Sequence, residues 1–571
     1  MSVPYFRFRR LARPLLAAAS LALACTAAPA ATGVALLDDP ALACAHPLPD
    51  FSYAGYGFGL TPLPRATGQV IDVRDFGAKA DDAIDDSKAL LKAIAAANAV
   101  TGPVIVQLPP GRLILSEVLR IERSDFVLRG SGPGQGGSEL YIPRPLRLVD
   151  RGHDLDELRA YLDKYDKRQV EPDHNIDLRF SEYSWSGGFV WVQKPGTRPS
   201  AYLEERDPRS AATRLATVRA GKRGDNRLQL AAGAKLAVGD VVQVRWFNGD
   251  GKHGPLLKEI YGDTDLEIGS HHWTFPDRPL VRQSTRVIAI DGDTITLADP
   301  LLHDAGGALR ADIGAWEHLS EVGIEDLAIV FPAGTSFGHH LEQGYNGIYL
   351  TSVFNGWVRG VRIANSDNGI LTGNSASVTL ADVTTEGERA AHYAVHIGNV
   401  HNFLVTDLRV LNPVVHPLSI NTQATKSVFL RAQVFGEPAI DQHAGANHQN
   451  LFDNLTLHVR ARRDVKGPWY PLWNGSGAGY WEPGHGRFNT NWNLRVLVEA
   501  GAGADETVRL VGAAEGPEAR VVGVSGNRRF EVEYVPMPYL EGVNTALTVP
   551  SLYLYQLQRR RDGIAAAHEC K

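Results

Sequence analysis

The sequence predicts an all-β protein, a right-handed parallel β-helix with an N-terminal capping helix and a β-rich insertion. Three observations lead to this prediction: short strands recur with a steady period, a helix stands just before the first of them, and the period is lost in one internal stretch. Among the 571 residues, 57 are Gly and 33 are Pro, which supplies the many turns that short strands require.

The repeat is clearest where two sets of apolar residues recur in phase. One set advances by 22, 25, 24 and 23 residues, along Val361, Val383, Leu408, Ala432 and Leu455. The other advances by 22, 25, 23 and 22 residues, along Ile348, Ile370, Val395, Leu418 and Ile440. In a parallel β-helix each turn of the chain, called a coil below, returns to the same wall, so both sets are explained together. A leucine-rich horseshoe has a similar period, but its leucine and asparagine pattern is absent.

The N-terminus has the features of an export signal. A basic start that contains Arg7 and Arg13 precedes an apolar, small-residue run over residues 15–28, and cleavage is expected near Ala31. That run is too short to span a bilayer, and no later segment of the sequence reaches the required length. We therefore expect a secreted or periplasmic protein without a membrane span.

Six segments are expected along the chain. They are a signal peptide (1–31), an N-terminal extension (32–69), the cap and first coils (70–178), the insertion (179–303), the main coils (304–530) and a C-terminal tail (531–571). Two cysteines, Cys44 and Cys570, remain after cleavage and lie near opposite ends of the mature chain. In an exported protein they either form a disulfide that joins the two ends or stay as free thiols.

Residues 70–115 carry the most specific motif. Phe76-Gly77-Ala78-Lys79 is followed by an acidic loop, and Asp85-Asp86-Ser87 supplies side chains that start helices. A helix with one apolar side is expected over residues 87–97, followed by a strand and a Pro110-Gly111 turn. Such a helix would cover the open end of a stack of strands, which would otherwise be free to aggregate.

This motif resembles the N-terminal start of the pectate lyase-like superfamily, especially its rhamnogalacturonase- and epimerase-like β-helix proteins. The matching residues are Phe76 to Lys79, Asp85 to Ser87, Pro110-Gly111 and the later glycine turn Gly130 to Gly134. Ser87 stands where threonine is commoner, and Ala80 and Ala83 depart from the usual loop. The resemblance implies the β-helix fold and action on a polysaccharide. It does not select a reaction, because the superfamily contains lyases, hydrolases and epimerases.

The second apolar set also predicts a substrate surface. If its residues point into the coil, the small residues just before them, such as Gly347 and Ala394, point outward and form a shallow floor. Polar side chains border this floor on coils about 4.8 Å apart. A sugar chain lying along the floor would contact the predicted substrate-binding residues Tyr345, Tyr349, Glu437, Asp441 and His443.

The predicted catalytic residues are Asp367, Arg389, His392 and His396. Asp367 and His392 occupy one column on adjacent coils, where the carboxylate would raise the pKa of the imidazole and fix its tautomer. We expect His392 to be a base and Arg389 to stabilise an enolate-like anion, with Tyr345 or His396 as the acid. The alternative for each residue is a solvated rim without a catalytic role.

Two further sets of residues stay open. His339-His340 precede one of the coils and either reach the site or belong to an ordinary loop. Asn346 and Asn368 are expected to stack in a structural ladder, which Tyr393 and His416 continue.

These residues favour a lyase that cleaves a uronic-acid-containing polysaccharide by β-elimination. A glycoside hydrolase is the first alternative, but it needs two carboxyl groups about 5–9.5 Å apart, and Asp367 and Glu437 would lie roughly 14 Å apart across three coils. A glycan-binding or adhesion protein without catalysis is the second.

Cofactors and partners are only partly predicted. No cofactor is certain, since the superfamily's acidic calcium cluster is not evident in this column, although Ca²⁺ stays open. The net charge of −6 without a basic run excludes nucleic acid as a partner, and no pattern predicts an oligomeric state.

Overall fold

The computed structural model describes residues 32–165, 180–197, 213–263, 265–443, 445–475, 477, 479–513, 516–535 and 539–564. The expected signal peptide and Cys570 lie outside the described residues. Cys44 is disulfide-bonded. Within the described part of the chain, no helix has both the length and the apolar character needed to cross a membrane.

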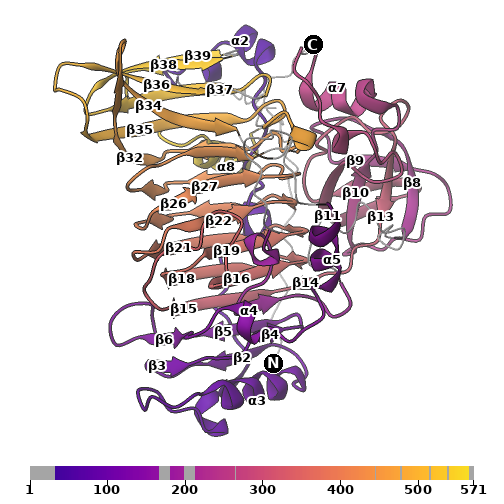
Figure 1. The fold of residues 1–571 in the computed structure, drawn as a ribbon. Helices are drawn as coiled ribbons and strands as arrows, with labels where there is room; N and C mark the ends of the chain where they lie inside the picture. Colours follow the sequence, from indigo (N-terminus) through magenta and orange to yellow (C-terminus); the bar gives the residue numbers. More distant parts are fainter. Residues whose placement is uncertain are drawn as a thin grey trace, which may run out of the picture.

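The predicted fold class is confirmed: the chain winds into a parallel β-helix whose coils stack from α3 to the C-terminal strands (Figure 1). Within the described residues, its long wall is a 17-stranded sheet. The strands of the long wall are β1 (Gln69–Asp72), β2 (Val104–Gln107), β3 (Gly111–Ile114), β5 (Phe126–Arg129), β6 (Ser138–Tyr141), β15 (Val322–Val330), β18 (Trp357–Ala364), β21 (Thr379–Glu386), β24 (Leu404–Thr406), β25 (Arg409–Val410), β28 (Val428–Leu430), β29 (Gln433–Val434), β31 (Leu451–Asp453), β32 (Thr456–Arg460), β35 (Thr490–Ala500), β37 (Arg520–Gly526) and β39 (Tyr539–Val543).

Two further walls complete the coil. The site wall contains β4 (Leu119–Ile121), β7 (Val190–Val192), β16 (Asn346–Thr351), β19 (Asn368–Gly373), β22 (Ala391–Ile397), β26 (Val414–His416), β27 (Leu418–Asn421), β30 (Ile440–His443), β33 (Arg462–Asp464), β34 (Gly467–Gly475), β36 (Thr507–Ala513) and β38 (Arg529–Val535). The short wall contains β14 (Leu319–Ser320), β17 (Val353–Phe354), β20 (Ser375–Ala376) and β23 (Val400–His401).

Buried apolar side chains hold successive coils in register. Ile348 pairs with Ile370 and Ile370 with Val395, and all three are fully buried, as the second apolar set predicts. On the long wall Val361 pairs with Val383 inside the same core. Burying each such side chain contributes about 1.5–3 kcal/mol, so the interior column favours one alignment of the strands.

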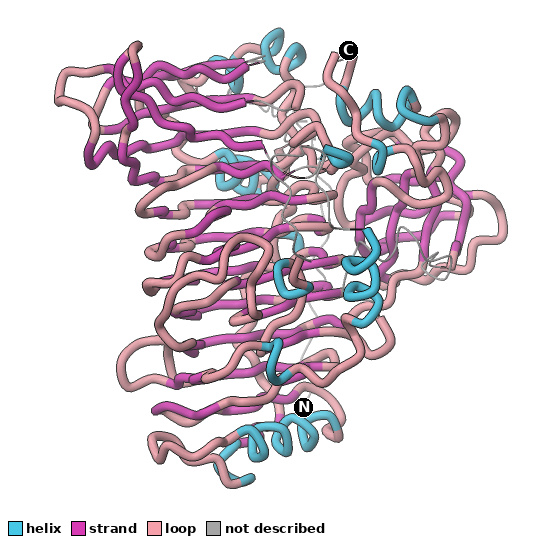
Figure 2. Tube along the Cα trace, viewed as in Figure 1, coloured by secondary structure: helices cyan, strands magenta, loops and turns pink. Residues whose placement is uncertain are grey.

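The N-terminal motif closes one end of the stack. Figure 2 shows α3 (Ser87–Asn98) lying across the first coil, where Leu90 and Ile94 are buried. The Asp86 carboxylate accepts hydrogen bonds from the amides of Lys79 (2.9 Å) and Ile114 (3.0 Å). The Asp86 side chain makes no capping hydrogen bond to α3, contrary to the expected helix-start role, and instead ties the acidic loop to the first strands. The 3₁₀ helices η1 (Tyr56–Gly59) and η2 (Val73–Phe76) precede it.

The insertion is a closed antiparallel barrel. It is built from β8 (Arg214–Gly221), β9 (Arg227–Leu230), β10 (Val241–Trp246), β11 (Val281–Asp291), β12 (Thr294–Leu297) and β13 (Ala311–Gly314). These bounds differ from the expected 179–303, because β7 pairs with β4 and β16 and is part of the coil. The barrel also carries η6 (Gly251–His253), α7 (Pro255–Tyr261) and η7 (Ser270–His272).

The barrel docks beside the short wall (Figure 1). The Asp299 carboxylate lies 2.8 Å from Nε2 of His401 and accepts a 2.9 Å hydrogen bond from Asn402. Trp316, just after the barrel, packs edge-on against Phe354 of the short wall. The contact therefore combines buried polar and aromatic groups.

The two ends of the described chain meet on the outer face of the long wall. The N-terminal extension contains α1 (Ala35–Asp38) and α2 (Pro40–Ala45). Apolar side chains of this extension, including Leu36 of α1, are buried in one cluster with Trp492 and with α8 (Leu552–Arg561). The segment expected as a tail thus contains β39, which continues the long wall, and an ordered helix. The remaining helices are α4 (Leu146–Val149), α5 (Asp156–Tyr165), η4 (Glu182–Ser184) and η8 (Gly479–Trp481).

Asp453 fastens α8 to the coil, so we expect Asp453→Ala to lower stability by about 2–4 kcal/mol. Its buried carboxylate accepts hydrogen bonds from the Ser551 hydroxyl (2.6 Å) and from the amides of Leu552 (3.2 Å) and Tyr553 (2.9 Å). Calorimetry and protease cleavage near α8 measure the effect. Asp291→Ala, at the exposed end of β11, is the control and should change stability by less than about 0.5 kcal/mol. Equal melting of both variants would show that this contact does not stabilise the protein.

Candidate active site

The small residues that were expected to form a floor lie inside the coil. A Cβ added to Gly347 would lie 3.1 Å from the side chain of Ile363, and one added to Gly369 would lie 3.2 Å from that of Thr385. Ala394 is also buried. These residues lie inside β16, β19 and β22, and the residue after each of them is also buried in the core, so two successive residues face the interior. The predicted floor is therefore wrong.

The site wall instead carries a group of imidazoles and carboxylates, which we call the histidine cluster. Its members are His339, Glu342, His392, His416, Asp441 and His443. His392 comes from β22, His416 from β26, and Asp441 and His443 from β30. His339 and Glu342 come from the loop of residues 331–345 between β15 and β16. Neighbouring coils and one loop therefore bring the cluster together.

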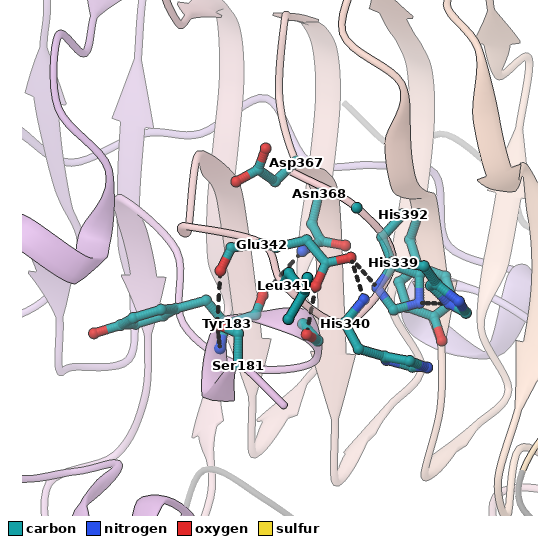
Figure 3. Close-up of polar contacts among 12 residues, drawn as sticks. Ser181, Tyr183, His339, His340, Leu341, Glu342, Asp367, Asn368 and His392 are labelled. Carbon is teal, nitrogen blue, oxygen red and sulfur yellow. Dashed lines mark hydrogen bonds and ion pairs between the residues drawn. The ribbon is translucent and has the colours of Figure 1, made fainter. Parts of the chain in front are cut away.

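A line of three groups leads from a buried carboxylate to an exposed imidazole (Figure 3). Oε1 of Glu342 lies 3.0 Å from Nδ1 of His392, and Nε2 of His392 lies 3.0 Å from Nε2 of His339. The other Glu342 oxygen accepts a 2.5 Å hydrogen bond from Ser184. The His392 side chain is fully buried, whereas His339 is exposed. The line therefore connects the interior of the site wall with solvent.

Burial sets the protonation of this line. Loss of hydration, followed by repulsion from His339 and other imidazoles, holds the pKa of His392 well below its ordinary value. His339 reaches solvent on one side, but loss of hydration where it packs into the cluster, followed by repulsion from His416, lowers its pKa to about 4. Burial raises the pKa of Glu342, although the hydrogen bond from Ser184 opposes this. The imidazoles of His392 and His339 are thus neutral near pH 7.

The second half of the cluster is centred on Asp441, which is completely buried. One carboxylate oxygen lies 3.3 Å from Nδ1 of His416 and the other lies 3.3 Å from Nδ1 of His443. The Ser419 hydroxyl donates a 2.7 Å hydrogen bond to the same carboxylate. Burial raises the pKa of Asp441, but the two neighbouring imidazoles outweigh it and hold that pKa well below its ordinary value. Two imidazoles and one carboxylate are ligands that suit a divalent transition metal.

Asp367 and Arg389 form a separate group, so the predicted pairing of Asp367 with His392 is wrong. The Asp367 carboxylate accepts hydrogen bonds from three successive amides at the end of the loop, those of Gln343, Gly344 and Tyr345. Arg389 lies 3.6 Å from Asp367 and donates to the carbonyls of Pro332, Thr335 and Asn365. Both side chains are buried. The carboxylate beside the His392 imidazole is instead Glu342.

The other predicted site residues fall into different environments. Tyr349 is buried against Trp191, with ring centroids 5.3 Å apart, so its predicted contact with substrate is wrong. His396 is buried edge-on against Tyr393, and burial lowers its pKa to about 3. Tyr345 is partly exposed.

Two predicted residues lie toward solvent. Glu437 is exposed and lies 3.9 Å from Arg462. The His443 side chain is 16% exposed, so it lies at the edge of the cluster. The binding roles of Tyr345, Glu437, Asp441 and His443 stay predictions.

Three important members escaped sequence reasoning for different reasons. Glu342 lies in a loop outside the strand period, and no local pattern marks it. His339 was recognised only as a residue that either reaches the site or does not. His416 follows the Asn346 and Asn368 column, where a structural role was expected. The adjacent pair His339-His340 before a coil was the one available signal.

Arg389 anchors the 331–345 loop, and we expect Arg389→Met to release it. The variant loses the ion-pair contact with Asp367 and three hydrogen bonds to loop and bend carbonyls. Amide hydrogen exchange over residues 333–343 should accelerate about tenfold or more. Arg409→Met, at an exposed position of the long wall, is the control. Unchanged exchange in Arg389→Met would mean that other contacts hold the loop.

Comparison with known proteins agrees with the fold. Residues 70–138, which contain α3 and the first coils, match the family model described as rhamnogalacturonase A/epimerase, pectate lyase-like. No curated protein matches the sequence.

Solved structures of three proteins illustrate the range of similar folds. The tailspike protein gp49 from Pseudomonas phage LKA1 is 12% identical, with 83% of this chain and 81% of that chain covered and a TM-score of 0.44. The exopolygalacturonase from Thermotoga maritima is 10% identical, with 83% and 93% covered and a TM-score of 0.30. The A-module of the mannuronan C-5 epimerase AlgE4 from Azotobacter vinelandii is 11% identical, with 83% and 96% covered and a TM-score of 0.29. Scores at this level do not transfer a reaction.

The match at the N-terminal motif and the stacked coils that follow it confirm the resemblance seen in the sequence. The chain is a parallel β-helix protein whose residues 70–138 are similar to the pectate lyase-like family.

Proposed function

We propose that this chain is an exported enzyme that cleaves a uronic-acid-containing polysaccharide by β-elimination. The observation that carries the proposal is the line from Glu342 through His392 to the exposed His339. Oε1 of Glu342 lies at ion-pair distance from Nδ1 of His392 without a hydrogen bond between them, and carboxylate–imidazole pairs serve as general bases. Export is supported by the basic and apolar N-terminal sequence and by the disulfide at Cys44, which favours an oxidising compartment.

We propose an order for the proton transfers, which the distances along this line support. With the proton of His392 on Nδ1, facing Glu342, its Nε2 accepts from Nε2 of His339. The Nδ1 of His339 then has the lone pair that would accept the substrate proton. When His339 takes up a proton, His392 and Glu342 share and stabilise the positive charge.

In the reaction, His339 removes the proton beside the sugar carboxylate. The electron pair of that C–H bond forms a carbon–carbon double bond, and the glycosidic C–O bond breaks. The leaving oxygen takes a proton from an acid, for which partly exposed Tyr345 is the candidate. The products are an unsaturated uronate and a new sugar end.

Purified mature protein should therefore act on an acidic polysaccharide, where the absorbance of an unsaturated uronate and the number of reducing ends should rise together. Neither signal should rise with a neutral polysaccharide. Reducing ends alone would identify a glycoside hydrolase. Retained binding with neither signal would identify a glycan-binding or adhesion protein. Either result contradicts the proposed elimination.

Substitutions in the line should reduce turnover while the fold is kept. We expect His392→Ala and Glu342→Gln to lower the rate by about 10²–10⁴-fold, because the base loses its orientation. His458→Ala and Glu499→Gln are matched controls, since these residues form a similar pair, 2.9 Å apart, on the long wall. Initial rates measure the effect, and circular dichroism checks folding. Wild-type rates in His392→Ala would show that the proposed base, His339, does not depend on His392.

A further inference from the structure

We propose that His416, Asp441 and His443 bind one divalent transition metal ion. The proposal rests first on His416, whose side chain is only 4% exposed. Neither ring nitrogen has a hydrogen-bond partner, although Nδ1 lies 3.3 Å from Asp441. A buried imidazole that makes no hydrogen bond is costly, and a metal ion would use its lone pair.

The separations within this group fit one ion. The three side chains each offer an atom within 4.8 Å of the others. Both histidine nitrogens lie 3.3 Å from an Asp441 oxygen. Two atoms bound to one Zn²⁺ at about 2.0–2.1 Å with a tetrahedral angle are about 3.4 Å apart. Small side-chain shifts would therefore place all three around one ion.

The fold holds these ligands in place. Asp441 and His443 are two residues apart on β30, so their side chains leave the same face of the strand. β27 pairs with β30 in register, Ser419 beside Asp441, and the Ser419 hydroxyl orients the carboxylate. Such outer hydrogen bonds are typical of metal sites and tune their ligands.

The ligand types select the class of ion. Two imidazoles with one carboxylate suit Zn²⁺, Co²⁺, Ni²⁺ or Fe²⁺, whereas Ca²⁺ and Mg²⁺ prefer oxygen ligands. With three protein ligands, a fourth position remains for water or substrate.

The site also deepens the proposed function and in that respect rests on it. β-Elimination needs a positive charge beside the sugar carboxylate, and the expected cation, Arg389, is committed to Asp367 and to backbone carbonyls. His416 also belongs to a second group with His339 and His392, whose ligand atoms lie within 4.8 Å of one another. A metal ion held by His416 would supply that charge next to the proposed base.

Binding is tested without reference to turnover. Tag-free mature protein is stripped with a chelator and titrated with Zn²⁺ by calorimetry and with Co²⁺ by visible absorption. We expect one ion per chain, a Co²⁺ spectrum of low-coordinate nitrogen and oxygen ligands, and no comparable binding of Ca²⁺. A stoichiometry near zero, or preference for Ca²⁺, would overturn the proposal.

Variants locate the ion. His416→Ala and His443→Ala should weaken Zn²⁺ binding roughly 100-fold or more, and Ser419→Ala about 10-fold, since it removes only the orienting hydrogen bond. His458→Ala, on the long wall, should bind as the wild type does. His443 is partly exposed, so its variant tests the site even if His416→Ala fails to fold. Unchanged affinity in His443→Ala places the ion elsewhere and contradicts the assignment.

The outcomes separate the two proposals. If the protein binds metal but acts on no acidic polysaccharide, the metal site is supported and the proposed elimination is contradicted. Elimination activity in metal-stripped protein, with no Zn²⁺ uptake, keeps the enzyme and overturns the site.

Discussion

Ile348, Ile370 and Val395 lie beside one another on successive strands of the site wall, fully buried and paired in register. This stacking determines where every other side chain of the coil goes. A slip of one residue would exchange the inward and outward faces of a strand. Because the register is held, residues 22 to 25 positions apart in the chain become neighbours, and His392, His416 and Asp441 meet on one wall.

Forming the histidine cluster costs free energy, because its imidazoles and carboxylates lose most of their hydration. Its imidazoles and carboxylates are mostly buried, and burial is the largest influence on the pKa values of His392 and Glu342. Proteins retain such arrangements where they serve a function, because buried ionisable groups are costly when they only fill space. The loop of residues 331–345 brings His339 and Glu342 to the cluster, and its hydrogen bonds to Asp367 and Arg389 connect it to the wall.

The coil was predictable from the sequence because its cause is periodic. Both apolar sets lie where they were expected, and the N-terminal motif forms the cap. The predicted floor is wrong because strict strand alternation was assumed at Gly347 and Gly369, where two successive residues face the interior. Glu342 was missed for a related reason: it lies in a loop, and loop geometry follows from contacts such as the three amides bound by Asp367, which no spacing in the sequence reveals.

The cluster in which both ends of the described chain meet has a consequence for the order of folding. Ala35 donates an amide hydrogen bond to Glu541, and Phe51 donates one to Gln556, across separations of 506 and 505 residues. The coils depend on much shorter loops, so they can assemble while the chain is still emerging. The contact between the two ends can form only after α8 has been synthesised. A chain that ended before α8 would form nearly all of the coils but would expose apolar surface around Trp492. Quality-control proteases can recognise such a form.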